Sequence, residues 1–228
     1  MHGSDISLHC IEAKPSIPIV FLHGNGESSD YFKGQIEYFS KKRYIYAPDT
    51  RGHGASPRGD APFTLEQFAD DLKCFLDEKR IEKADIVGFS DGGNIALIFT
   101  LKYPERVNKL VLNSANLSPD GLKAGTLFSI KISDLFSRFL GEKGKKKREF
   151  YALMLKGPDI DPDELFAIDL PVLVIAGTKD VIKKKHTKLI ADSIWGSKLV
   201  FLKGDHYLAE KNSAKFNRAL EKFLDSRS

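Results

Sequence analysis

The chain has 228 residues, of which 42% are hydrophobic and 29% charged, and its formal net charge at pH 7 is +4. This length and composition are typical of one globular domain with a full hydrophobic core, and they exclude a disordered or fibrous chain. They also disfavour a nucleic-acid-binding protein, because Lys and Arg form only one dense run, at residues 143–148. We interpret that run as a solvated surface, with contact to an anionic partner as the less favoured alternative.

Short apolar runs alternate with segments of helical periodicity along the chain. Strands are expected at residues 6–12, 17–22, 43–47, 84–89, 108–113, 171–176 and 198–202. Between them, a helix is expected at 64–79, where Thr64 and Gln67 indicate a capping box, and another at about 212–225. This alternation predicts a mostly parallel twisted sheet of about seven strands, with helices on both faces.

Residues 117–169 interrupt the alternation. They carry apolar side chains at helical spacing on both sides of the basic run, which first of all indicates a packing surface and could also line an acyl pocket. We therefore divide the single domain into an α/β core, residues 1–116 plus 170–228, and a helical insert, residues 117–169.

The residues around Ser90 predict a sharp turn from a strand into a helix. Gly88 and Gly92 flank the turn, where side chains would collide with it. Such a turn exposes the serine Oγ and directs the N–H groups of the following helix at whatever the serine attacks. Because similar glycine patterns occur in phosphate-binding loops, the interpretation of Ser90 as a nucleophile depends on finding its partners.

A reactive serine needs an imidazole base and an acid that orients the imidazole. His206 follows the expected strand 198–202, and Asp180 follows the expected strand 171–176. The ends of parallel strands are where an open sheet gathers its chemistry. We therefore assign His206 as the base and Asp180 as the acid, although a lone aspartate at that place would more often cap a helix.

Other polar residues of these motifs have structural interpretations. His23 and His53 lie in tight glycine turns, where an imidazole can bond to the loop backbone. His186 is expected to face solvent and Asp205 to be an ordinary loop residue. Asp91 could recognise a cationic substrate group or raise the pKa of the base, but a capping role is preferred because the helix dipole favours an acid there.

The three candidate residues occur along the chain in the order Ser90, Asp180, His206. In this order the chain resembles an α/β-hydrolase, a family whose catalytic serine, acid and histidine follow one another in the same way. Two further motifs agree with the resemblance: His23-Gly24-Asn25-Gly26 after the expected strand 17–22, and Asp49-Thr50-Arg51-Gly52-His53-Gly54-Ala55-Ser56 after the expected strand 43–47.

The resemblance implies several features of the site. The backbone N–H groups of Asn25 and Asp91 would form the oxyanion hole, residues 117–169 would be a helical lid, and no cofactor would be required. Glu27 departs from the family pattern, which often has glycine at this position.

The sequence therefore predicts a serine hydrolase that cleaves a small carboxylic ester or thioester through an acyl-enzyme intermediate. A C–C bond hydrolase or lactonase with the same triad is the alternative, and a ligand-binding protein without turnover is less favoured. The expected partner is a small acyl substrate rather than nucleic acid, and the oligomeric state stays open.

No metal site is expected, because no two histidines are spaced as on one helix face and no Cys-x-x-Cys occurs. No apolar stretch approaches the about 20 residues needed to span a bilayer. The two cysteines, Cys10 and Cys74, without a long apolar leader before residue 17, favour reduced thiols in a cytoplasmic enzyme.

Overall fold

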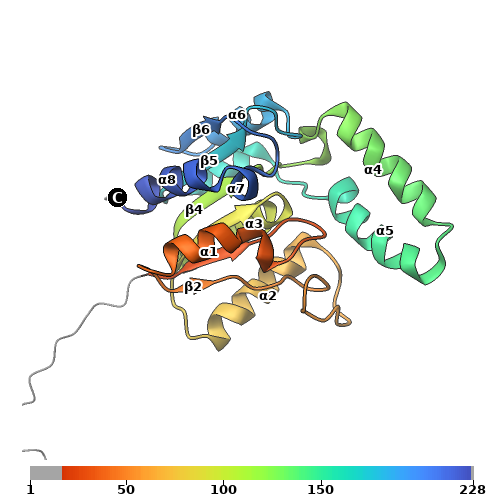
Figure 1. Cartoon of the computed structure of the whole chain (residues 1–228), viewed down its shortest axis with the longest axis horizontal. Coiled ribbons are helices and arrows are strands. Elements are labelled where there is room, and N and C mark those ends of the chain that lie inside the picture. The colour runs from red at the N-terminus through yellow and green to blue at the C-terminus, as the bar shows by residue number, and fades with distance from the viewer. Residues whose placement is uncertain (1–16, 227–228) are drawn as a thin grey trace, which may run out of the picture.

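The computed structural model describes residues 17–226, so the strand expected at 6–12, together with Cys10, lies outside the described residues. The described residues form one sheet of six parallel strands in the order β2-β1-β3-β4-β5-β6 (Figure 1). The strands are β1 Ile19–Leu22, β2 Ile45–Tyr46, β3 Ala84–Phe89, β4 Val107–Asn113, β5 Val172–Gly177 and β6 Lys198–Leu202. These bounds agree within two residues with the six expected strands that fall in this part of the chain.

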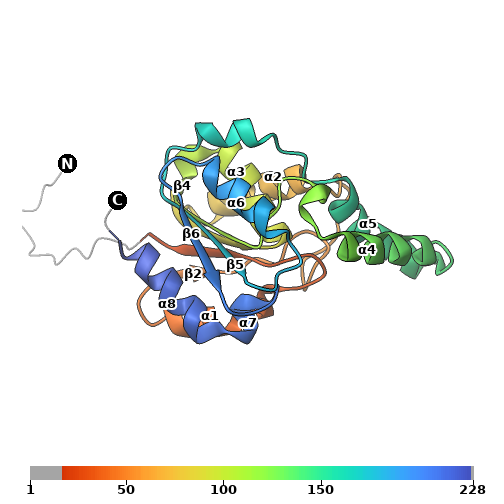
Figure 2. The ribbon, with the colours of Figure 1, turned by 90° about the horizontal axis from the view of Figure 1, so that it is seen from above.

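The central strands are mostly apolar and buried because helices cover both faces of the sheet. Every residue of β3 and of β5 is buried, as expected when neither face of a parallel strand meets water. Helices α2 and α3 with α6 lie on one face, and α1 and α7 with α8 lie on the other (Figure 2). Their bounds are α1 Lys33–Phe39, α2 Leu65–Glu78, α3 Asp91–Lys102, α6 Lys184–Asp192, α7 Leu208–Lys211 and α8 Ser213–Leu224.

Each face of the sheet has its own core. Leu22 and Ile86 belong to the core beneath α2 and α3, whereas their neighbours Phe21 and Val87 belong to the core beneath α1 and α8. Successive side chains of a strand point to opposite faces, so a continuous apolar run fills both cores at once.

The start of α2 forms only half of the expected capping box. The Thr64 side chain accepts a hydrogen bond from the Gln67 backbone N–H, with 3.2 Å between the atoms. The Gln67 side chain does not return to the backbone of Thr64, however, but donates to Asp71 Oδ1 at 3.1 Å. The predicted reciprocal bond is therefore wrong, because a carboxylate one turn further along α2 offers a competing acceptor.

Two helices of the insert, α4 Ala124–Ser137 and α5 Gly141–Lys156, pack against each other and project away from the sheet (Figures 1 and 2). We call residues 124–156 the helical hairpin. Four short 3₁₀ helices complete the secondary structure of residues 17–226: Ser29–Phe32, Pro104–Arg106, Pro119–Gly121 and Pro162–Ala167. None of the described helices has both the length and the hydropathy needed to cross a membrane.

Candidate active site

Ser90 lies in a strained turn between β3 and α3. Its backbone has φ 53° and ψ −121°, a conformation that residues other than glycine rarely adopt and that persists only where the surrounding structure imposes it. A Cβ on Gly88 would lie 2.2 Å from the carbonyl oxygen of Gly92, and a Cβ on Gly92 would lie 2.1 Å from that of Leu22. Both glycines are therefore required by the close approach of α3 to β3 and β1.

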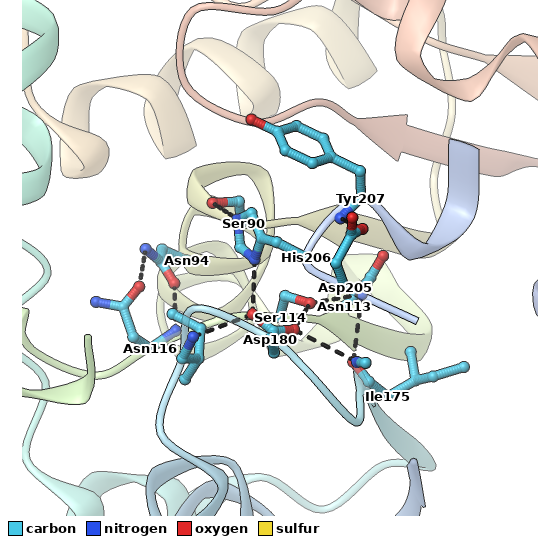
Figure 3. A network of polar contacts seen from close by, with 12 residues as sticks. Ser90, Asn94, Asn113, Ser114, Asn116, Ile175, Asp180, Asp205, His206 and Tyr207 are labelled. Atoms are coloured by element: carbon cyan, nitrogen blue, oxygen red, sulfur yellow. Dashed lines mark hydrogen bonds and ion pairs between the residues drawn. The ribbon is translucent and has the colours of Figure 1, made fainter. Parts of the chain in front are cut away.

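The structure brings the side chains of Ser90, His206 and Asp180 together at the carboxyl end of the sheet (Figure 3). Ser90 Oγ lies 3.1 Å from His206 Nε2, and His206 Nδ1 lies 2.7 Å from Asp180 Oδ1. With the proton on Nδ1 donated to the carboxylate, Nε2 is left as an acceptor for the serine hydroxyl.

Asp180 is held by more than the histidine. Ser114, directly after β4, donates a hydrogen bond from Oγ to Asp180 Oδ2 at 2.5 Å, and the backbone N–H of Ile182 donates to Oδ1 at 3.0 Å. Burial alone would raise the pKa of Asp180, but the hydrogen bonds from His206 and Ser114 outweigh it and hold the pKa below its usual range. Asp180 does not cap α6, whose N-cap residue is Lys183.

Ser114 was not among the residues expected in the site. A serine hydroxyl after a strand gives no signal of its own in the sequence. The one available signal was position, since the loop after β4 borders the loop after β5 in the sheet order.

Asp91 and Asn25 are joined by their side chains. Asn25 Nδ2 donates to Asp91 Oδ2 at 2.8 Å and to the carbonyl oxygen of Phe150 in the helical hairpin at 2.9 Å. The other carboxylate oxygen of Asp91 accepts from Asn94 Nδ2 at 3.2 Å. Burial raises the pKa of Asp91, while the two amide donors act in the opposite direction.

These contacts correct the capping role expected for Asp91. The residue does lie in the first turn of α3, where the dipole favours an acid, but its carboxylate bonds to amide side chains rather than to the backbone N–H groups of the helix. Within residues 17–226, neither the backbone N–H of Asn25 nor that of Asp91 donates a hydrogen bond to another protein group.

Glu27 contributes a further carboxyl group to the site, besides those of Asp180 and Asp91. Its Oε2 accepts a hydrogen bond from the backbone N–H of Gly24 at 3.3 Å. Burial raises the pKa of Glu27 to about 7, and the Gly24 N–H offsets part of this effect.

The other expected residues are placed as follows. His23 Nδ1 lies 2.8 Å from the carbonyl oxygen of Gly24, and His53 Nδ1 lies 3.0 Å from that of Arg51, so both rings bond to loop backbone as predicted. Asp205 accepts from the backbone N–H of Tyr207 and from Lys211, as a loop residue does.

The expectation that His186 faces solvent is wrong. The ring is partly buried, and its Nε2 accepts a hydrogen bond from the backbone N–H of Leu117 at 2.9 Å. This contact holds the start of the insert against α6, two segments that the sequence alone did not show to be neighbours.

A cavity of about 240 Å³ opens at Ser90 and His206. Its polar wall contains Asn25, Glu27 and Asp91, and among residues 17–226 neither a lysine nor an arginine lines it. Its apolar wall is built by side chains of the insert and of the loop after β5: Leu122, Ile130, Met154, Val181 and Ile182. In the described part of the chain, no three His, Cys, Asp or Glu side chains are grouped as ligands of a metal ion would be.

Comparisons with known proteins agree with this architecture. The family described as "alpha/beta hydrolase fold" matches residues 17–141. The chain is 27% identical to a 3-oxoadipate enol-lactonase of Acinetobacter baylyi, over 89% of this chain and 86% of that protein. It is 29% identical to the human serine hydrolase BPHL, over 88% of this chain and 76% of that protein. Among solved structures, the enol-lactonase from Burkholderia xenovorans has a TM-score of 0.75 at 23% identity, covering 92% of each chain.

Proposed function

The chain belongs to the α/β-hydrolase family, and on that premise we propose that it is a serine hydrolase that cleaves a small carboxylic ester or thioester through an acyl-enzyme intermediate. The observation that carries the proposal is the contact series from Ser90 Oγ to His206, 3.1 Å, and from His206 to Asp180, 2.7 Å, at the mouth of a cavity. Such a series provides what an otherwise weak serine nucleophile requires.

In the acylation step, His206 Nε2 takes the proton of Ser90 as the serine oxygen bonds to the substrate carbonyl carbon. Asp180, kept ionised by its hydrogen bonds, stabilises the imidazolium that forms. The backbone N–H groups of Asn25 and Asp91 donate to the oxyanion, and Asp91 does so from the N-terminus of α3, where the dipole favours negative charge. The imidazolium then protonates the leaving alcohol or thiol.

In the deacylation step, water replaces the leaving group. His206 Nε2 takes a proton from the water as the oxygen attacks the acyl carbon. Collapse of the second oxyanion releases the acid and returns the proton to Ser90 Oγ. In this cycle His206 accepts and returns each proton and water is the co-reactant, so the proposal includes no cofactor.

The cavity supports a small and uncharged acyl group. At about 240 Å³ it lies below the range of about 300–1,000 Å³ that is usual for sites of drug-sized ligands. Glu27 and Asp91 line it, and none of the lysines or arginines in the described part of the chain does, so a substrate carboxylate would lie beside carboxyl groups without a Lys or Arg partner there. In this proposal residues 117–169 serve as the lid, because Ile130 and Met154 form part of the apolar wall.

A lactone is the second candidate substrate. The likeness to enol-lactonases favours it, and a lactone is opened by the same attack of Ser90 on an acyl carbon. In that case the leaving alcohol stays covalently part of the acyl-enzyme, and deacylation releases a single hydroxy acid.

Covalent labelling tests the proposal most directly. A fluorophosphonate should phosphonylate the purified protein at Ser90, with the modified peptide located by mass spectrometry. Ser90→Ala should not be labelled. Failure of the unaltered protein to react, or equal labelling of Ser90→Ala, would reject the nucleophile and favour a ligand-binding role. A panel of chromogenic esters, acyl thioesters and lactones then separates the substrate classes by their kcat/KM values.

A further inference from the structure

The helical hairpin carries a row of large apolar side chains that nothing in residues 17–226 covers. Phe128 is 67% exposed, Phe136 65% and Phe139 81%. Ile132, Leu135 and Leu140 add to this row with exposed fractions between 37% and 51%. We call these six side chains the outer face of the hairpin.

The outer face and the cavity lie on different sides of α4. Thr126 and Ile130 line the cavity, whereas positions 128, 132, 135, 136 and 139 follow the spacing of the opposite helical stripe. A helix that is apolar on both sides is normally buried on both sides. Here one side meets the cavity and α5, and the other is left open on a hairpin that extends away from the sheet (Figures 1 and 2).

The helical hairpin that carries the outer face is also rich in basic residues. Between Ala124 and Lys156 there are eight Lys or Arg residues and three Asp or Glu residues, a net charge of +5, whereas the whole chain carries +4. The densest run, at 143–148, begins three residues after Leu140. Lys143, Lys145 and Lys147 are exposed, next in sequence to the exposed Phe139 and Leu140 at the tip.

We propose that the hairpin is a docking surface for an anionic lipid membrane. Phenylalanine and leucine side chains would enter the interface between head groups and acyl chains, while the lysines contact the anionic head groups around them. The alkyl stems of lysine can lie along the apolar layer with their charges at the surface, so the two residue types act together. This inference does not depend on the proposed catalytic function.

The charge distribution favours a lipid surface over a second copy of this chain. Pairing two outer faces would bring two hairpins of net charge +5 together, so Coulomb repulsion would oppose the gain from burying apolar area. An anionic surface instead attracts the same groups. Its attraction should weaken with salt, because the interaction is screened over about 8–10 Å at physiological ionic strength.

Sedimentation with vesicles tests the proposal. The full chain should pellet with vesicles of phosphatidylcholine and phosphatidylglycerol, and much less with pure phosphatidylcholine, and binding should fall as salt is raised. The double variant Phe136→Ser with Phe139→Ser, and the triple variant Lys143→Glu, Lys145→Glu and Lys147→Glu, should each weaken binding to anionic vesicles about tenfold or more.

Two control variants change the same residue types elsewhere. Trp195→Ser removes an apolar side chain that is 86% exposed, and Lys185→Glu with Lys188→Glu reverses two exposed charges on α6. Both controls should bind vesicles nearly as the unaltered protein does. Circular dichroism spectra and thermal unfolding midpoints of the hairpin variants should match those of the unaltered protein, which checks that each variant keeps its fold.

The proposal is overturned if the unaltered chain does not pellet with anionic vesicles, or if hairpin and control variants bind equally. Sedimentation equilibrium without lipid provides a further check. A dimer that dissociates in the Phe136 and Phe139 variant would identify a second copy as the occupant of the outer face and would also reject the lipid surface.

Discussion

Asn25 Nδ2 lies 2.8 Å from Asp91 Oδ2, and the same nitrogen lies 2.9 Å from the carbonyl oxygen of Phe150. One amide group thereby connects the loop after β1, the first turn of α3 and the helical hairpin. The two backbone N–H groups proposed for the oxyanion hole belong to the residues of this pair, so their spacing depends on a side-chain contact.

Replacing Asn25 by alanine should lower kcat without removing either backbone N–H group. The loop would lose its bond to Asp91, and a buried carboxylate would lose one of its two amide donors. Loss of an oxyanion donor costs about 10²–10³ in kcat, and displacement of a donor that is still present should cost about tenfold. Steady-state kinetics with a good ester substrate give kcat and KM separately.

Asn108→Ala is a matched control, because Asn108 Nδ2 also donates to a buried aspartate, Asp85 Oδ1 at 2.6 Å, at the start of β3 and so at the end of the strand opposite Ser90. It should reduce stability and leave kcat unchanged. Equal kcat values for Asn25→Ala and the unaltered enzyme would contradict the role given to this contact.

Ser114→Ala should reduce turnover through Asp180. The variant removes the hydrogen bond from Ser114 Oγ to Asp180 Oδ2, 2.5 Å, so the carboxylate is held less firmly against His206. We expect kcat to fall about tenfold, equivalent to about 1.4 kcal/mol, with KM nearly unchanged, because the imidazolium is stabilised chiefly in the transition state.

Ser197→Ala serves as the comparison for Ser114→Ala. Ser197 Oγ donates to the carbonyl oxygen of Ala191 at 2.7 Å, remote from the cavity. If Ser114→Ala altered kcat no more than Ser197→Ala does, the hydroxyl would have only a structural role.

Glu27 should make the stability of the protein fall between about pH 4.5 and pH 7. Its folded-state pKa is about 7 and its ordinary value is 4.5, because burial disfavours the charged form. The stabilising contribution of protonated Glu27 to the free energy of unfolding is therefore fully present below pH 4.5 and is lost as pH rises through 7. Urea unfolding of the unaltered protein and of Glu27→Gln, at pH 4.5 and pH 8, measures it.

The variant Glu27→Gln keeps an oxygen acceptor for the Gly24 N–H but cannot ionise. The free energy of unfolding of the variant minus that of the unaltered protein should therefore be larger at pH 8 than at pH 4.5. Glu37→Gln, at an exposed position on α1, should show no such difference. A constant difference between Glu27→Gln and the unaltered protein across this range would mean that folding does not raise the pKa of Glu27.

Ile130→Ala should extend the range of acyl chains that the cavity accepts. Ile130 lines the apolar wall of a cavity of about 240 Å³, so removing its branched side chain makes room for additional methylene groups. One methylene in an apolar pocket is worth about 1–3 kcal/mol, so kcat/KM for the longer esters should rise about tenfold relative to the acetate ester. A chromogenic ester series from acetate to octanoate measures the profile.

Ile132→Ala changes the same residue type on the outer side of α4 and should leave the acyl-length profile as it is. If both variants shifted the profile equally, selection by the cavity wall would be rejected in favour of a general loosening of the hairpin.

Much of the fold could be predicted from the chain because the signals were local. β3 is a mostly apolar run that leads into glycine-flanked Ser90, and the glycines are needed by the turn that the same residues form. Asp180 and His206 could be found because each follows directly after an apolar strand, and in a parallel sheet the ends of strands lie on one edge.

The partners of these residues could not be predicted in this way. Ser114 and Asp180 are 66 positions apart, and Asn25 and Phe150 are 125 positions apart, so neither contact leaves a periodicity or spacing in the chain. The half-formed capping box at Thr64 shows the same effect at short range, since Asp71 competes for the Gln67 side chain.

The sequence by itself determined the order of strands and helices along the chain, the turn at Ser90, and His206 and Asp180 as the candidate partners of Ser90. These features follow from local backbone preference and from burial patterns. Only the tertiary structure decided that the Ser114 hydroxyl bonds to Asp180 and that the Asn25 amide bonds to Asp91. It also decided where Glu27 lies and which side of α4 meets the cavity. These depend on how elements pack in space, where distances of about 3 Å are set by the whole core rather than by neighbouring residues.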